Sequence, residues 1–513
     1  MDFITVLAFI GLALLVWDCI EVGRNDAANI VNAVFGARIL PRRVAVAFAG
    51  VAVIAGATLA TPVMETARKG IFDPGMLGTI ERAMIVYISV YLVDTVLLYV
   101  YSTFGMPVST TACLVFELVG ASMGVAGVEI VHWDKVRTVV LAIIFSIIMT
   151  GIAGFLVQRV FRAAIRDRID DRETILLHGP WICGLMLTGL AWFMIFKGMK
   201  GVALVQQIRE STIDAYTPTL AFLVAWGAAT LAVHIFLTTT GKWGAKMLFP
   251  GMAVLGMLCL AFAFGQNDLA NCASPGLSAF WLWRHSTEEV AVATKIPIPP
   301  YVLFACGCLI VGGMWTRDAQ RVTRAAVNTG SQFDKVALYA PNWCRAVARG
   351  ILAVLPKRPE LAPPPTKSPA GKKVHYDSLR AAVISSVSAG VIALASSRGL
   401  PVSTTYVAFA AVIATGLADR VLSRGDADLK IGRAIWVVLC WFLAAALAVA
   451  ATAGVARVIF HMGIVGVAIA AGVNLAIRLY AKRRADAQEE RVHLRVSKEG
   501  GKDALEADQD ITQ

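Results

Sequence analysis

Two short polar motifs each occur twice in this chain, within stretches that are otherwise apolar. The first motif reads GRNDAAN at 23–29 and returns as GQNDLAN at 265–271. It places two carboxylates and four side-chain amides where the pattern predicts membrane depth: Asp26, Asp268, Asn25, Asn29, Asn267 and Asn271. Carboxylate and amide oxygens are ligands for hard cations, and a carboxylate can also carry a proton. The first motif therefore predicts a cation or proton site.

The second motif is rich in hydroxyl groups and reads PVSTT at 107–111 and again at 401–405. Its candidate side chains are Ser109, Thr110, Thr111, Ser403, Thr404 and Thr405. A proline followed by Ser and Thr is typical of the start of a helix, where the hydroxyls cap free backbone N–H groups. Hydroxyls beside such N–H groups can hold an oxyanion. The two motifs together predict a site for an anion and a cation.

The composition places these motifs in a membrane protein. Of 513 residues, 57% are hydrophobic and 16% charged, and the mean hydropathy is +0.68. Apolar runs of about 20 residues fill most of the chain, which predicts an all-α integral membrane protein and excludes a barrel of short strands. The net charge of +12 falls in loops. This distribution favours contact with the lipid bilayer over nucleic acid.

The apolar runs predict about 12–13 transmembrane elements. They lie near 3–35, 43–62, 83–104, 107–127, 136–161, 181–199, 219–240, 249–281, 301–316, 379–397, 400–418, 433–454 and 457–479. The chain starts without a basic leader or cleavage site, so the first run is expected to stay as a span. With the N-terminus outside, every basic loop and the C-terminal tail are cytoplasmic, in a plasma or bacterial inner membrane.

Seven elements precede the second ND motif, so it enters the membrane from the side opposite to the first. This parity predicts two inverted repeats around a shared site, as in alternating-access transporters. Gly23 and Gly265 stand before the ND pairs, and both helices are expected to break there. The PVSTT segments are expected to be further breaks or re-entrant hairpins.

The repeats divide the chain into four parts. Residues 1–161 form the first repeat, 162–248 a linking segment with two transmembrane helices, 249–454 the second repeat, and 455–513 a last helix with a charged tail. Residues 317–378 are polar and contain the proline-rich stretch 361–373. They are interpreted as a cytoplasmic insertion, an extended linker with a short helix around 333–355.

These motifs resemble those of the inorganic phosphate transporter (PiT) family, in which each half carries GxNDxAN followed by P-x-STT. The resemblance covers roughly 3–161 and 249–454, and it implies symport of inorganic phosphate with Na⁺ or H⁺. It places phosphate among Asp26, Asn29, Asp268, Asn271 and both STT segments, and Na⁺ or another cation near Asn25, Asp26, Asn267 and Asp268. The chain departs from many members at Ala112 and Tyr406, where they have His, and at Arg24 and Gln266, where they have a small residue.

The two acids give a physical reason for coupled transport. Two carboxylates would repel an anion in a low dielectric, so cations or protons must accompany it. Protonated phosphate can donate a hydrogen bond to a carboxylate, whereas sulfate cannot, which favours phosphate. A sulfate or other oxyanion symporter, an anion channel and an intramembrane hydrolase remain alternatives, although no further nucleophile and base suggest an enzyme.

The remaining residues predict few other sites. The nine cysteines are interpreted as packing residues, because neither they nor the seven histidines show metal-ligand spacing. No cofactor is expected. Arg24 is expected to make a structural ion pair with Glu21 or Asp26. The oligomeric state stays open, with a homodimer as one option.

Overall fold

The structure is a computed structural model that describes residues 2–60, 71, 72, 74–195, 203–212, 217–285, 298–354, 367, 372, 374–423 and 425–510. Its described part is almost entirely helical. The helices are α1 (Phe3–Gly36), α2 (Arg42–Thr58), α4 (Ile80–Thr103), α5 (Thr110–Ala126), α6 (Trp133–Ile165), α7 (Arg172–Phe193), α8 (Ala203–Thr212), α9 (Pro218–Arg284), α10 (Pro300–Met314), α11 (Arg317–Thr329), α12 (Asn342–Val354), α13 (Ser378–Ser396), α14 (Thr404–Ala418), α15 (Ala427–Met462), α16 (Ile464–Lys498) and α17 (Lys502–Asp510). This confirms the all-α fold.

Eight of the described helices are long and apolar enough to cross a membrane, or nine if the bent pair α10 and α11 counts as one span. The chain is therefore a multi-pass membrane protein, as its composition predicts. Helices α5 and α14, which follow the PVSTT motifs, are shorter apolar helices. The elements expected at 219–240 and 249–281 are joined into α9, which turns sharply at Gly241, where φ is 62°.

Helices α1 and the second half of α9 form the centre of the bundle and run in opposite directions. The N-terminal end of α1 contacts the C-terminal end of α9, where the indole N–H of Trp283 donates to the hydroxyl of Thr5 at 3.0 Å. Further along α1, the sulfur atoms of Cys19 and Cys272 lie 3.5 Å apart. The two helices are therefore antiparallel. The two ND motifs consequently approach the middle of the bundle from opposite ends.

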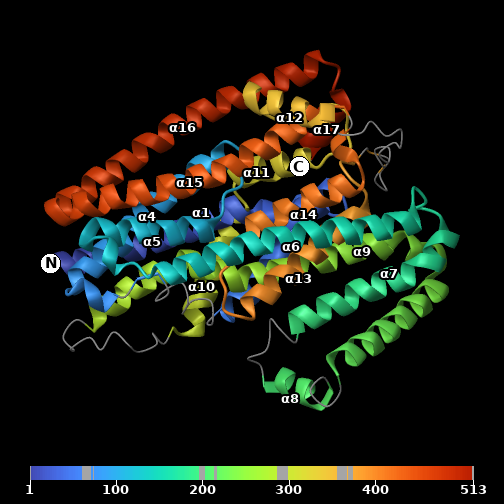
Figure 1. Cartoon of the computed structure of the whole chain (residues 1–513), viewed down its shortest axis with the longest axis horizontal. Helices are drawn as coiled ribbons and strands as arrows, with labels where there is room; N and C mark the ends of the chain where they lie inside the picture. The colour runs from blue at the N-terminus through green and yellow to red at the C-terminus, as the bar shows by residue number, and fades with distance from the viewer. Residues whose placement is uncertain are drawn as a thin grey trace.

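The other helices surround this pair in a bundle elongated along the helix axes (Figure 1). The N-terminus lies at one end of the bundle. The opposite end carries the α6–α7 connection, the turn of α9 at Gly241, and helices α12 and α17 (Figure 1). Helices α7, α8 and the first half of α9 form an arm at one side of the bundle (Figure 1).

Part of the expected linker 317–378 is instead packed helix. Helix α11 buries one face, where Val322 and Ala326 contact Ala28 of the first ND motif in α1. The linker interpretation of this part was wrong because its apolar residues recur at helical spacing within a polar sequence. Helix α12 lies within the expected short helix, and the proline-rich stretch lies mostly outside the described residues.

Candidate functional site

Both ND motifs lie on unbroken helices, contrary to the predicted breaks at Gly23 and Gly265. Helices α1 and α9 continue through them. The glycines serve close packing: a Cβ atom on Gly23 would lie 1.8 Å from the carbonyl oxygen of Ile310, and one on Gly265 would lie 2.2 Å from that of Val53. Neighbouring helices therefore cross α1 and α9 one turn from the acidic residues.

The PVSTT segments form the extended entries to α5 and α14. A glycine with positive φ precedes each of them, Gly105 at 64° and Gly399 at 67°. Ser109 caps α5 by accepting the backbone N–H of Ala112 at 3.0 Å, and Ser403 caps α14 by accepting that of Tyr406 at 3.1 Å. The sequence predicted both caps. The N-terminal ends of both short helices thus lie in the protein interior.

The two extended segments also contact one another reciprocally. The hydroxyl of Thr111 donates to the carbonyl of Val402 at 3.0 Å, and the hydroxyl of Thr405 lies 3.0 Å from the carbonyl of Val108. Asn267 donates to the same Val402 carbonyl at 2.7 Å. The contacts of Thr111 and Thr405 join the two PVSTT segments to each other, and the Asn267 contact joins the second ND motif to the second PVSTT segment.

The first ND motif contacts the first PVSTT segment as the second ND motif contacts the second one. The side-chain amide of Asn25 lies 3.0 Å from the hydroxyl of Ser102 and faces the backbone of Val108. Carbonyl and amide oxygens at these positions, together with the carboxylates, form an oxygen-rich set that suits a hard cation.

Asp26 lies fully buried among hydroxyl and amide groups. Asn29 donates to its carboxylate at 2.8 Å, and the hydroxyl of Thr405 lies 2.9 Å from it. The hydroxyl of Thr110 lies 3.3 Å from its second oxygen. Hydroxyl groups from both STT segments therefore lie within hydrogen-bonding distance of Asp26. These contacts explain how the helix can carry a buried carboxylate here without breaking.

Asp268 has an equivalent environment, also fully buried. Its carboxylate lies 3.0 Å from the hydroxyl of Thr110 and accepts the amide of Asn271 at 2.9 Å. Asn271 also donates to Thr111 at 2.9 Å. Because Thr110 contacts both Asp268 and Asp26, one hydroxyl bridges the two acids. Thr404, the first residue of α14, is buried beside them.

No lysine or arginine is among the described hydrogen-bonding partners of these two carboxylates. Arg24, next to the first motif, pairs instead with Glu21 at 2.7 Å, which confirms the structural pairing expected for it. The N-terminal ends of helices α5 and α14 supply positive potential to the site. A bound anion would thus need cations or protons on the acids.

Just beyond the second ND motif, a side chain opens the hydrogen-bond ladder of α9. The hydroxyl of Tyr91 donates to the carbonyl of Cys272 at 2.6 Å and accepts the N–H of Gly276 at 2.7 Å. In a regular helix these two backbone groups would bond to each other. Pro275 lacks an N–H group and removes the neighbouring bond. The helix is therefore continuous but locally opened here.

Comparison with known proteins agrees with this geometry. The model of the phosphate transporter family matches residues 22–329 and 369–454, a range that contains both ND motifs and both PVSTT motifs. The chain belongs to the phosphate transporter family. A Pyrococcus horikoshii protein named as a phosphate permease is 28% identical to this family member over 424 residues, 82% of this chain and 90% of that protein. A Thermococcus kodakarensis protein of similar name is 28% identical over 464 residues, 90% and 98% of the two chains.

A solved structure has the same fold as this family member. It is titled "The sodium-dependent phosphate transporter", with a TM-score of 0.66 and 20% sequence identity, and the match covers 89% of this chain and all of that one. The relatives are named as permeases and transporters, which are not enzymes. Family and fold together support phosphate transport rather than catalysis.

Several residues that support the site in this family member were not predicted from sequence. Trp441 donates to the carbonyl of Pro107 at 3.1 Å and stacks on Tyr406, with ring centroids 3.8 Å apart. The buried Arg433 donates to the carbonyl of Gly105 at 2.7 Å. Both hold the extended entry to α5. Both residues are visible in the sequence as an arginine and a tryptophan within an apolar run. The sequence does not show that they donate to the backbone carbonyls of Gly105 and Pro107.

Proposed function

We propose that this protein imports inorganic phosphate by symport with Na⁺ or H⁺. The observation that carries the proposal is the bridging of Asp26 and Asp268 by the hydroxyl of Thr110. It brings the acids of both halves into one buried site with the hydroxyls and helix N-termini that suit a tetrahedral oxyanion. Family membership supports phosphate as the substrate.

The acids then act as the coupling groups. Two carboxylates with no basic partner repel an anion by several kcal/mol each at an effective dielectric near 20. Na⁺ at Asn25, Asp26, Asn267 and Asp268, or protons on the acids, removes this repulsion. Asn29, Asn271 and the two STT segments then contact phosphate. The protein without its coupling cation is expected to bind phosphate poorly.

Transport by alternating access follows from an inverted repeat. The antiparallel course of α1 and the second half of α9, and the reciprocal contacts of Thr111 and Thr405, support two halves that rock about a common site. The connection between α6 and α7, which carries Arg166 and Arg168, lies at the bundle end opposite the N-terminus (Figure 1). The positive-inside bias makes that end cytoplasmic and the N-terminus external.

Uptake by proteoliposomes tests this proposal. Purified protein is given an inward Na⁺ gradient or an inward proton gradient, each applied alone, and labelled phosphate is followed inside the vesicles. One of the gradients is expected to drive phosphate above its equilibrium level. Phosphate that only equilibrates under both gradients would indicate an anion channel, the alternative mechanism.

Substrate choice requires a second measurement, because a sulfate symporter on the same scaffold is the closest alternative. Protonated phosphate can donate a hydrogen bond to Asp26 or Asp268, whereas sulfate at neutral pH cannot. Excess unlabelled phosphate is therefore expected to inhibit uptake of labelled phosphate far more strongly than excess sulfate. Equal inhibition by the two anions would reject the selectivity assigned to the acids.

A further inference from the structure

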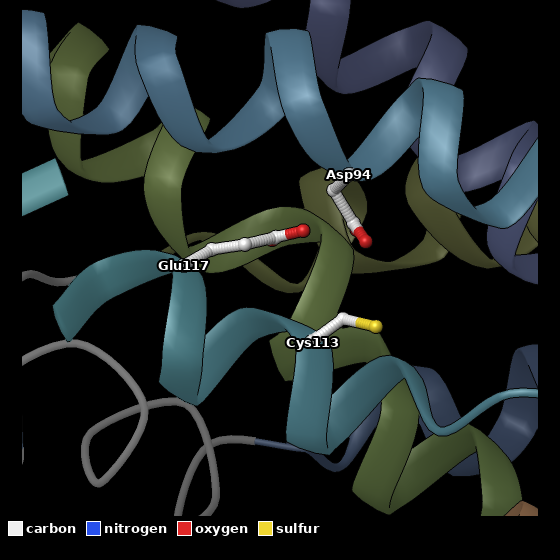
Figure 2. Close-up of side chains that lie close together, drawn as sticks. All are labelled: Asp94, Cys113 and Glu117. Carbon is white, nitrogen blue, oxygen red and sulfur yellow. The ribbon is translucent and has the colours of Figure 1, made fainter. Parts of the chain in front are cut away.

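A second group of acidic side chains lies inside the bundle, away from the Asp26 and Asp268 site. Asp94 of α4 and Glu117 of α5 point into the same space, together with the thiol of Cys113 (Figure 2). One oxygen or sulfur atom of each lies within 4.8 Å of the other two. Asp18 of α1 joins them within hydrogen-bonding reach of Asp94. We call Asp18, Asp94 and Glu117 the acid triad.

The triad is buried, yet its oxygens lack hydrogen-bond donors. The exposed fraction is 0% for Asp18, 1% for Asp94 and 0% for Glu117. In the described chain, no N–H or O–H group donates to either oxygen of Asp18 or Glu117, or to Oδ1 of Asp94. Buried carboxylates without donors are costly, because they lose hydration without a substitute.

Neighbouring charged and polar groups are already engaged elsewhere. Arg24 and Arg478 both pair with Glu21, at 2.7 Å and 2.9 Å, one turn along α1 from Asp18. The hydroxyl of Thr95 donates to a backbone carbonyl at 2.7 Å. The other titratable groups facing the triad are the thiols of Cys113 and Cys272 and the phenol of Tyr91. None of them supplies a positive charge.

The triad must therefore be neutralised by protons or by a metal ion. A hard cation such as Na⁺ prefers carbonyl, hydroxyl and carboxylate oxygens around it, but here a thiol faces the space. The hydroxyl of Thr95 donates within α4, and that of Tyr91 is bonded to backbone groups of α9. Asp94, by contrast, lies within hydrogen-bonding reach of both Asp18 and Glu117. A protonated carboxyl group can donate to a neighbouring carboxylate, which satisfies both without another ligand.

We propose that Asp18, Asp94 and Glu117 form a proton-binding site in the membrane interior, distinct from the Asp26 and Asp268 site. Asp18 precedes Asp26 by eight residues, about 12 Å along α1. The shared protons join α1, α4 and α5, and α5 also carries Thr110. The triad thus stores protons on the same helices that form the phosphate site, whichever ion drives transport.

Infrared difference spectroscopy on the full-length protein in lipid tests this proposal without phosphate. Glu117→Gln and Asp94→Asn replace a carboxyl group by an amide that keeps its shape. Wild-type protein at neutral pH is expected to show a protonated-carboxyl C=O band that each variant loses in part. If Glu117→Gln fails to fold, Asp18→Asn provides the same comparison. Asp134→Asn, on the exposed start of α6, is the control and should keep the whole band.

Two results would overturn the assignment. One is an unchanged carboxyl band in all three triad variants, which would mean that the triad carries no proton at neutral pH. The other is thermal stabilisation of metal-stripped wild-type protein by Na⁺ alone or Mn²⁺ alone that the triad variants lose, which would make the triad a metal site. Neither outcome depends on phosphate uptake, so the proposed transport function is tested separately.

Discussion

The hydroxyl of Thr110, from the first PVSTT motif, lies 3.0 Å from the carboxylate of Asp268, which belongs to the second ND motif. The same hydroxyl lies 3.3 Å from the carboxylate of Asp26. One threonine of the first half therefore contacts the acids of both halves. Single substitutions of the acids, hydroxyls, glycines and caps can therefore separate what each contributes to transport and to stability.

Removing either central charge is expected to abolish cation-driven uptake. Asp26→Asn and Asp268→Asn keep the side-chain shape but cannot carry a proton or hold a cation by charge. Labelled phosphate in proteoliposomes should fall to the level of protein-free vesicles, while the amount of folded protein stays the same. Asp134→Asn, on the exposed first turn of α6, should transport like the wild type. Full uptake by both central variants would remove these acids from the mechanism.

Removing the Thr405 hydroxyl is expected to weaken transport without unfolding the protein. Thr405→Val deletes a group that lies 2.9 Å from Asp26, and a hydrogen bond to a charged group contributes about 1.5–3 kcal/mol. The ratio of maximal uptake rate to half-saturating phosphate concentration should fall roughly 10-fold to 100-fold. Thr188→Val is the matched control, because its buried hydroxyl donates to the carbonyl of Gly184 within α7 and lies outside the motifs. Equal effects of the two variants would show that the loss is a general packing effect.

Gly265 is expected to tolerate no side chain. Gly265→Ala places a Cβ atom 2.2 Å from the backbone of α2, and overpacking of this kind costs about 1–3 kcal/mol. The melting temperature in detergent and the yield of folded protein should both fall. Gly251→Ala, on an open face of the same helix with no atom within 4 Å, should leave them unchanged or raised. A similar melting temperature for both variants would contradict the close crossing of α2 and α9.

The cap of α14 is expected to matter for both stability and uptake. Ser403→Ala removes the acceptor for the Tyr406 N–H, at a cost of about 1 kcal/mol, and deletes one of the hydroxyls proposed to contact phosphate. Thr79→Ala removes the cap of α4, which accepts the Arg82 N–H at 3.3 Å near the surface. Both variants should lower the melting temperature, but only Ser403→Ala should reduce uptake. Wild-type uptake by Ser403→Ala would show that its hydroxyl acts only as a cap.

The residues of the two motifs lie together in the structure, as Thr110 and Thr405 contact the acids of the ND motifs. The serine caps follow from proline and hydroxyl residues next to an apolar run, and the all-α fold follows from the length of the runs. The predicted breaks at Gly23 and Gly265 were wrong for a tertiary reason. Hydroxyls from distant segments, such as Thr405, satisfy the acids, and the glycines accommodate crossing helices instead of unwinding their own.

The acid triad shows a second limit of sequence reasoning. Asp18, Asp94 and Glu117 lie in the apolar runs 3–35, 83–104 and 107–127, where acidic residues are unusual. Only the packing of α1, α4 and α5 brings them together. The buried face of α11 was missed because segment 317–378 was interpreted from its overall polar composition. That composition does not reveal the amphipathic helix that packs against the first ND motif.

The hydroxyl of Tyr91 inserted into α9 has a consequence for motion of the bundle. If α4 moves away from α9, the N–H of Gly276 and the carbonyl of Cys272 can bond to each other directly, so neither is left buried without a partner. The phenol is the only group of this contact that must find a new partner or water. The contact between α4 and α9 can therefore break and re-form, directly after Asn271, without leaving either backbone group of α9 unpaired.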